Sequence, residues 1–337
     1  MLSTSNSKVF FRSIGICMAY LATAFITPLS QASGNVDLTA YNQKLAENAN
    51  DSSTINYSEI ASKPHLWPVN TVTPNAGALL PFNRIVAYYG NFYSKKMGVL
   101  GQYPPDEMLT MLNGEVAKWK AADPQTPVIP AIHYIAVVAQ HDAGKDGMYR
   151  VRMPDAQIQK ALTLANQAKG VAILDIQVGL SNVQAEVPHL ESYLTLPNVH
   201  LALDPEFSTK SGGKPGSVIG SMDAADINYA ANYLAEIVKK NNLPPKMLIV
   251  HRFTQHMITN YKDIKPLPEV QIVIDMDGWG SQAKKLSTYE NFIYAQPVQF
   301  TGFKLFYSND LKPPSTGLYT PEQIMKFKPR PIYILYQ

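Results

Sequence analysis

Residues 154–178, PDAQIQKALTLANQAKGVAILDIQV, contain a helix-to-strand unit that decides the fold class. The first part follows a helical pattern and ends at Gly170, a residue common just past the C-terminal end of a helix. The compact apolar run that follows at once is typical of a parallel strand buried on both faces. This unit therefore predicts an α/β architecture.

The same alternation extends to the end of the sequence. Eight compact apolar runs lie at residues 84–90, 127–134, 170–178, 199–207, 246–253, 270–278, 301–307 and 331–337. Helical patterns are clearest at 104–120, 154–170 and 221–242, and weaker helices are expected after residues 184, 254, 280 and 320.

Strand starts recur at roughly 35 residues, close to the roughly 31 of a 250-residue eightfold barrel. We therefore predict that residues 83–337 form a (β/α)8 TIM barrel ending on its eighth strand. A doubly wound open sheet is the alternative. It would usually carry a G-x-G-x-x-G turn after the first strand, and YYGNFYSKKMG at 88–98 does not match that pattern.

Residues 1–32 have the organisation of a signal peptide. Lys8 and Arg12 precede the apolar stretch 13–27, and Pro28 and the small-residue cleavage pattern SQA follow. The apolar stretch is shorter than the roughly 20 residues of a membrane span, so cleavage after Ala32 is expected rather than a membrane anchor. The protein is thus predicted to be exported, periplasmic or secreted, with no stable membrane span after cleavage.

Residues 33–82 are polar and interrupted by prolines, with a possible short helix near YNQKLAENA. We expect an extended N-terminal segment lying against the barrel, with a disordered leader as the alternative. Removal of residues 1–32 also removes Cys17, the only cysteine, and leaves 27 Lys and Arg against 26 Asp and Glu. A cysteine-free chain suits an oxidising compartment, and a near-neutral one gives no reason to expect nucleic acid.

Strand alternation predicts a group of inward polar side chains at the carboxyl ends of the strands, where barrel enzymes react. Leu201 and Leu203 are expected to face the helices, which turns Asp204 and Glu206 inward. The same rule turns a polar residue inward on the other strands after the first, namely His133, Asp175, Gln177, His251, Asp275, Asp277, Lys304 and Gln337. The alternative is a buried ion-pair lattice, such as Lys304 with Asp275.

Neighbouring carboxylates in a partly desolvated site have pKa values driven apart, so that one stays protonated. We predict Glu206 as the proton donor and Asp204 as the residue that orients it. A fourth strand ending in Asp-x-Glu resembles the chitinase and muramidase types of glycoside hydrolase, a resemblance that implies these same roles. IDMDGWG at 274–280 is similar to the Met-x-Tyr-Asp segment of chitinase-like barrels at Asp277, but lacks the tyrosine, and Ala202 stands where the fuller signature has another Asp.

A broader resemblance covers nearly the whole barrel. The signal peptide, the YYG, LDIQ, LALDPE, VHRF and DMDGWG segments and the closing YQ resemble an uncharacterised family of exported bacterial barrel proteins, some of them lipoproteins. This resemblance implies the fold and the location, and no activity is established for the family.

Together these features predict a glycoside hydrolase-like barrel that acts on a glycan or another small polar substrate, without a cofactor or metal. A second carboxylate, Asp175, Asp275 or Asp277, would stabilise the positive sugar ring or activate water. Aromatic side chains suited to sugar rings are Tyr88, Tyr89, Tyr134, Trp279 and Tyr307.

Two alternatives remain. One is a non-catalytic carbohydrate-binding barrel. The other is a metal-dependent hydrolase with His133, Asp175, His251 and Asp275 as ligands, although no H-E-x-x-H motif is present.

Overall fold

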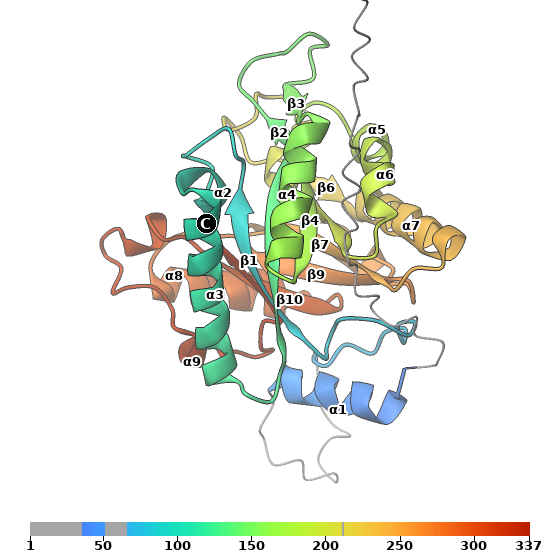
Figure 1. The fold of residues 1–337 in the computed structure, drawn as a ribbon, viewed down its shortest axis with the longest axis vertical. Helices are drawn as coiled ribbons and strands as arrows, with labels where there is room; N and C mark the ends of the chain where they lie inside the picture. Colours follow the sequence, from blue (N-terminus) through green and yellow to red (C-terminus); the bar gives the residue numbers. More distant parts are fainter. Residues whose placement is uncertain (1–35, 51–65, 211) are drawn as a thin grey trace, which may run out of the picture. The chain divides into compact units, whose positions relative to one another are not determined.

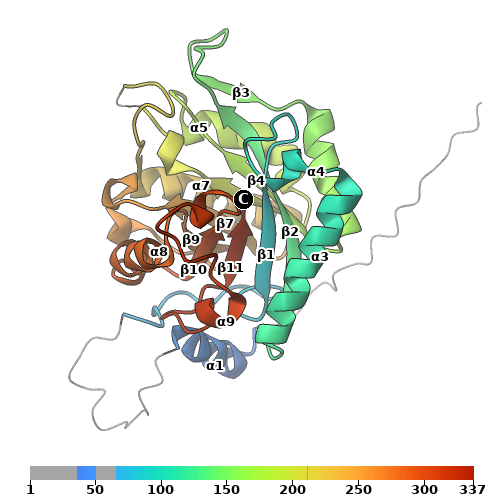
Figure 2. The same cartoon turned by 90° about the vertical axis from the view of Figure 1, so that its left-hand side faces the viewer.

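Eight parallel strands form a closed ring in the computed structural model, which describes residues 36–50, 66–210 and 212–337 (Figures 1 and 2). Neighbouring strands pair in chain order, and β11 pairs with β1, which also pairs with β2. The strands of the ring are β1 (Arg84–Gly90), β2 (Val128–Ala139), β4 (Val171–Ile176), β5 (Val199–Leu203), β7 (Lys246–Arg252), β9 (Val270–Met276), β10 (Phe300–Leu305) and β11 (Tyr333–Tyr336).

All eight predicted strands are present, and the prediction of a TIM barrel is confirmed. The open-sheet alternative is wrong, because the β1–β11 and β1–β2 pairings leave this ring without a free edge. Three short strands lie outside it. β3 (Arg150–Arg152) runs antiparallel to the end of β2, and β6 (Met222–Asp223) pairs with β8 (Ile258–Thr259).

The predicted helices follow most of the strands. The three clearest, α3 (Pro105–Ala122), α4 (Asp155–Gln167) and α7 (Ala224–Asn241), are confirmed within a few residues, and Figure 2 shows α3 and α4 outside the strands. The shorter helices are α2 (Val99–Gln102), α5 (Val183–Glu186), α6 (Glu191–Leu194), α8 (Gln282–Thr288) and α9 (Pro321–Ile324).

One expected helix, after residue 254, is replaced by 3-10 turns at Gln255–Met257 and Tyr261–Asp263. Asn260 takes a left-handed backbone with φ of 54°, which breaks a helix. The Arg252 guanidinium also binds the carbonyls of Thr254 and Gln255, satisfying groups that a helix would otherwise bond internally.

Side-chain alternation divides the core into two layers, as predicted. Leu201, Leu203 and the outward residues of the other strands pack against the helices in one apolar cluster. Ala202, Val273 and their inward neighbours form a second cluster inside the ring. The alternation of side chains along the strands, from which the inward polar residues were predicted, is therefore confirmed.

The described part of the N-terminal extension packs at the end of the barrel where the strands begin. Helix α1 (Leu38–Ala49), seen below the barrel in Figure 1, starts at Asp37, whose carboxylate accepts the N–H groups of Thr39 and Ala40. Asn50 donates to the carbonyl of Phe327, 2.8 Å away. Leu80 exchanges two hydrogen bonds with Gln271 near the start of β9.

The predicted signal peptide, residues 1–32, lies outside the described residues. Within the part of the chain that the structure describes, no helix is both long and apolar enough to cross a membrane.

Candidate active site

An open cleft of about 880 Å³ lies over the carboxyl ends of the barrel strands. Its polar lining combines three acids with three lysines and three amides. These residues are Asp204, Glu206, Asp277, Lys96, Lys284, Lys304, Gln177, Asn309 and Gln337. Aromatic rings complete the walls, contributed by Tyr89, Phe207, Phe253, Trp279, Phe292 and Phe306.

Glu206 is positioned by the residue that precedes its own turn. Strand β5 ends at Leu203, and the Asp204 carboxylate accepts the backbone N–H of Glu206 at 3.1 Å, which starts the 3-10 turn Pro205–Phe207. The carbonyl of Glu206 accepts the N–H of Gly220, so the turn is also held from the loop that follows. This pair of bonds fixes the backbone of Glu206 at the mouth of the barrel.

The two acids of this segment have different surroundings. Glu206 is partly buried in the cleft wall, and burial together with the nearby Asp277 charge raises its pKa to about 7. Asp204 is buried beneath it and accepts a bond from Gln177 Nε2 at 3.2 Å. Burial raises the pKa of Asp204 well above its ordinary value. Glu206 is thus the acid that can exchange a proton with a substrate near neutral pH.

Asp277 supplies a second carboxylate to the cleft. It follows β9, and its Oδ1 lies 2.9 Å from Lys304 Nζ on the adjacent β10. Burial alone would lower the pKa of Lys304, but the ion pair with Asp277 and the nearby Asp204 and Asp275 together outweigh it, and the pKa is raised. The ammonium also lies 3.8 Å from the centre of the Tyr89 ring, a cation–π contact.

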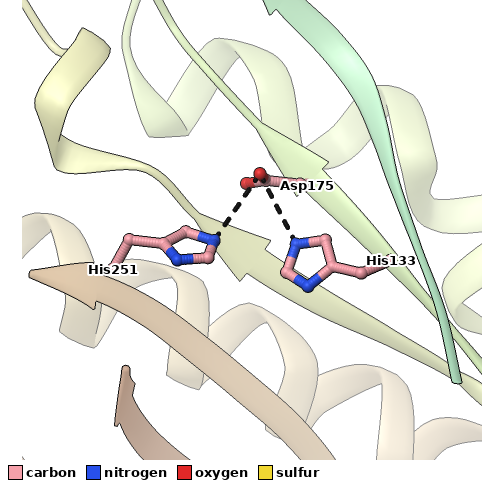
Figure 3. A group of neighbouring side chains, drawn as sticks. All are labelled: His133, Asp175 and His251. Carbon is pink, nitrogen blue, oxygen red and sulfur yellow. Dashed lines mark ion pairs between the residues drawn. The ribbon is translucent and has the colours of Figure 1, made fainter. Parts of the chain in front are cut away.

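A buried cluster lies beneath this cleft, inside the ring. Figure 3 shows His133 from β2, Asp175 from β4 and His251 from β7, with the two imidazoles directed at one carboxylate. The two histidine Nε2 atoms are 3.5 and 3.6 Å from Asp175 Oδ2. All three side chains are fully buried, and none of them lines the cleft.

The outer nitrogens of both imidazoles have partners of their own. His133 Nδ1 is 2.6 Å from the hydroxyl of Tyr333. His251 Nδ1 is 3.2 Å from Asp275 Oδ2 and 3.4 Å from Asp277 Oδ2. The cluster is therefore continuous with the cleft through Asp277.

The protonation of the cluster follows from burial and charge. Burial lowers the pKa of His133 to about 4. Burial also disfavours a charge on His251, but the surrounding carboxylates, Asp277 and Asp175 foremost, raise its pKa well above the ordinary value. Burial would raise the pKa of Asp175, yet its electrostatic interactions with the two nearby histidines lower it, whereas burial raises the pKa of Asp275.

Most of the sequence-predicted residues fall into two groups. Glu206, Asp204, Asp277, Gln177, Lys304, Trp279 and Gln337 line the cleft. His133, Asp175, His251 and Asp275 lie together underneath, fully buried. The expected ion pair of Lys304 with Asp275 is replaced by the pair with Asp277.

Tyr88 and Tyr307 were predicted to contact substrate, and neither of them lines the cleft. Tyr88 faces outward from β1, and its hydroxyl bonds to that of Tyr307 at 3.1 Å. Tyr307 in turn donates to Glu115 on α3. The Tyr88 ring meets Tyr336 edge to face and the Tyr307 ring stacks on Tyr336, between the barrel and its helices. Alternation along β1 gives the inward position to Tyr89 instead.

The sequence interpretation missed several cleft residues. Tyr333, which belongs to the cluster beneath the cleft, was also missed, although it lies at an inward position of β11 and alternation applied to that strand could have identified it. Lys96, Phe253 and Phe292 lie beyond the strand ends, where no periodicity places a side chain.

No protein-family model and no curated protein matches the sequence. Among solved structures, the mannanase Man26 of Bacillus subtilis is 12% identical, with a TM-score of 0.39 over 79% of this chain and 88% of that chain. The β-mannanase of Thermomonospora fusca, solved with mannohexaose, is 14% identical, with a TM-score of 0.37 over 69% and 76%. A hyperthermophilic endo-β-1,4-glucanase is 11% identical, with a TM-score of 0.35 over 76% and 88%.

Similarity at this level carries no argument about activity, and it leaves the resemblance to exported bacterial barrels as a prediction.

Proposed function

We propose that the protein is an exported glycoside hydrolase that cuts a glycan by acid–base catalysis between carboxyl groups. The observation that carries this proposal is the raised pKa of Glu206, about 7, in the wall of an open cleft. A carboxylic acid that keeps its proton near neutral pH can donate it to the leaving oxygen of a glycosidic bond.

Asp277 is the second carboxylate of the proposed mechanism. It lines the same cleft and is paired with Lys304, so it presents an anion toward the bound sugar. In this role it stabilises the positive charge that develops on the ring, or activates water. We do not assign this role to Asp175 or Asp275, because both are fully buried below the cleft floor.

Trp279 supports a glycan as the substrate. Its side chain is 49% exposed, it lies at the cleft, and the ammonium groups of Lys284 and Lys312 lie 4.8 and 5.7 Å from its ring centre. A large aromatic surface exposed beside carboxyl groups suits the stacking of a pyranose ring.

The test compares full-length wild type with Glu206→Gln on a panel of envelope, plant and host oligosaccharides. Product release is followed by chromatography, and binding by calorimetry. We expect turnover to fall by about 10³-fold or more in the variant, while binding changes little. The control Glu269→Gln removes another buried carboxylate, which lies just before β9 at the opposite end of the barrel, and should keep full activity.

A carbohydrate-binding barrel without catalysis is the rival outcome. It would bind an oligosaccharide in both forms and release no product from either. Hydrolysis that is unchanged in Glu206→Gln would also refute the proposed role.

Export is tested separately. Mass spectrometry of the protein recovered from a bacterial periplasm or medium should give a chain that begins at Ser33. Recovery of the intact N-terminus from the cytoplasm would contradict export.

A further inference from the structure

Three buried polar atoms of the cluster beneath the cleft have no hydrogen-bond partner. They are Nε2 of His133, Nε2 of His251 and Oδ1 of Asp175, and the three side chains have no exposed surface. Buried polar atoms in proteins are nearly always hydrogen-bonded, so three of them at one point indicate a ligand.

The spacing of these groups fits a metal ion. Each residue offers one ligand atom, and the three atoms lie within 4.8 Å of one another. The two Nε2 atoms are 3.5 and 3.6 Å from Asp175 Oδ2. Tetrahedral zinc with bonds of about 2.0–2.1 Å needs ligand atoms about 3.3 Å apart, so each Nε2–Oδ2 separation has to close by only a few tenths of an ångström. The two Nε2 atoms, which lie within 4.8 Å of each other, have to approach further by rotation of the imidazoles.

We propose that His133, Asp175 and His251 form a binding site for one divalent transition metal of the zinc type. Two imidazoles and a carboxylate are a ligand set that zinc accepts. The second oxygen of Asp175, which has no partner, is available as a further ligand.

The outer contacts of the histidines support this assignment. Tyr333 holds Nδ1 of His133 and Asp275 holds Nδ1 of His251, which leaves both Nε2 atoms directed at Asp175. Metal-binding histidines in proteins are oriented in the same way, by a carboxylate or another polar group on the second ring nitrogen.

The charge inside the barrel also favours a divalent ion. Asp175, Asp275 and Asp277 place three carboxyl groups in the buried interior, and the ammonium group of Lys304 pairs with Asp277. Buried carboxylates need compensation, and a divalent cation bound beside Asp175 would contribute to it.

The metal would act on the structure and not on the substrate. The three ligands come from β2, β4 and β7, so an ion would link three strands of the ring below the cleft floor. Tyr89 donates to Asp175 at 3.1 Å and lines the cleft, so the ion would also fix that part of the floor. This inference is independent of the proposed glycan hydrolysis.

The experiment uses the full chain, unfolded in denaturant with a chelator and refolded with ZnSO₄ or with chelator alone. After extensive dialysis, metal content is measured by elemental mass spectrometry and unfolding by calorimetry. We expect one Zn²⁺ per chain and a Tm higher by about 5 °C in the zinc sample. Refolding with Co²⁺ should give the visible absorption bands of a nitrogen- and oxygen-ligated ion.

Variants separate this site from surface histidines. Asp175→Asn and His133→Gln should lose the bound zinc, and Tyr333→Phe, which keeps both imidazoles, should weaken binding by about 10–100-fold. The matched control is His200→Gln, because His200 is also buried with an unpartnered Nε2 but lies outside the cluster. It should retain one Zn²⁺.

Either of two results would overturn the proposal. One is the absence of stoichiometric zinc and of a cobalt spectrum in refolded wild type. The other is equal zinc content in wild type, Asp175→Asn and Tyr333→Phe. Circular dichroism shows whether each variant is folded, and if the ligand variants do not fold, the wild-type cobalt spectrum and Tyr333→Phe decide the question.

Discussion

The ammonium group of Lys304 lies 2.9 Å from a carboxylate oxygen of Asp277, across the adjacent strands β10 and β9, with both side chains almost fully buried. Breaking a buried ion pair by removing one partner leaves an uncompensated charge, while removing both does not. The pair is therefore expected to behave as a unit in folding.

Asp277→Asn alone should lower the free energy of unfolding by about 3–5 kcal/mol, since it leaves Lys304 buried without its partner. Adding Lys304→Met to Asp277→Asn should recover at least about half of that loss. Urea unfolding of the two single variants and the double variant measures the coupling. Strictly additive losses would show that the pair does not act as a unit.

The rate of hydrolysis should depend on pH through Glu206. The acid has to be protonated to donate, so kcat/KM should fall above about pH 7, by about tenfold per pH unit. The measurement is kcat/KM between pH 5 and 9 on a substrate found in the oligosaccharide panel. A profile that stays flat up to pH 9 would contradict a proton-donating Glu206.

The free energy of unfolding should also depend on pH through Glu206, and should decrease as the pH rises. The pKa of Glu206 is raised in the fold, from 4.5 to about 7, so ionisation costs free energy in the native state. This cost is absent below about pH 4.5, grows as the pH rises and is complete above about pH 7.

Glu206→Gln removes that cost. The variant should be more stable than wild type by about 2 kcal/mol at pH 8 and equal to it at pH 4, a value reduced from the full shift because the side chain is partly exposed. Urea midpoints at the two pH values give the comparison. Equal midpoints at pH 8 would show that ionisation of Glu206 does not destabilise the native state.

Trp279→Ala tests the aromatic surface. Because the indole is half exposed, its loss should change the free energy of unfolding by less than about 0.5 kcal/mol. It should raise KM by about 3–10-fold with kcat nearly unchanged, as expected for lost stacking. Tyr294→Ala is the control, because Tyr294 is a similarly exposed aromatic that does not line the cleft. An equal change of KM in both variants would argue against stacking on Trp279.

The barrel and its inward polar residues were predictable because both follow from periodicity. Alternating apolar residues such as Leu201 and Leu203 identify the helix-facing side of β5, and Asp204 follows without further information. Tyr88 was misplaced because composition alone, without that alternation, made it a candidate for sugar contact. Applied to RIVAYYG, the same rule would have selected Tyr89.

The division of the site into two levels could not be predicted. Alternation predicts that the side chains of Asp175 and Asp277 point into the barrel. How deep each side chain lies below the cleft depends on how far the strands are staggered in the closed ring. Asp175 precedes the last residue of β4 and is fully buried, whereas Asp277 lies just past the end of β9 and lines the cleft. The lengths of the strands decide which acid meets solvent.

The pairing of β1 with β11 joins the first and last strands of the ring, Ile85 beside Tyr333. Contacts between such distant parts of a chain form late and slow folding, because a long loop must close before they are made. Until β11 is in place, the hydrogen-bonding groups along one side of β1 are open to pairing with other molecules. A nascent chain is therefore at its most aggregation-prone just before its final strand is in place.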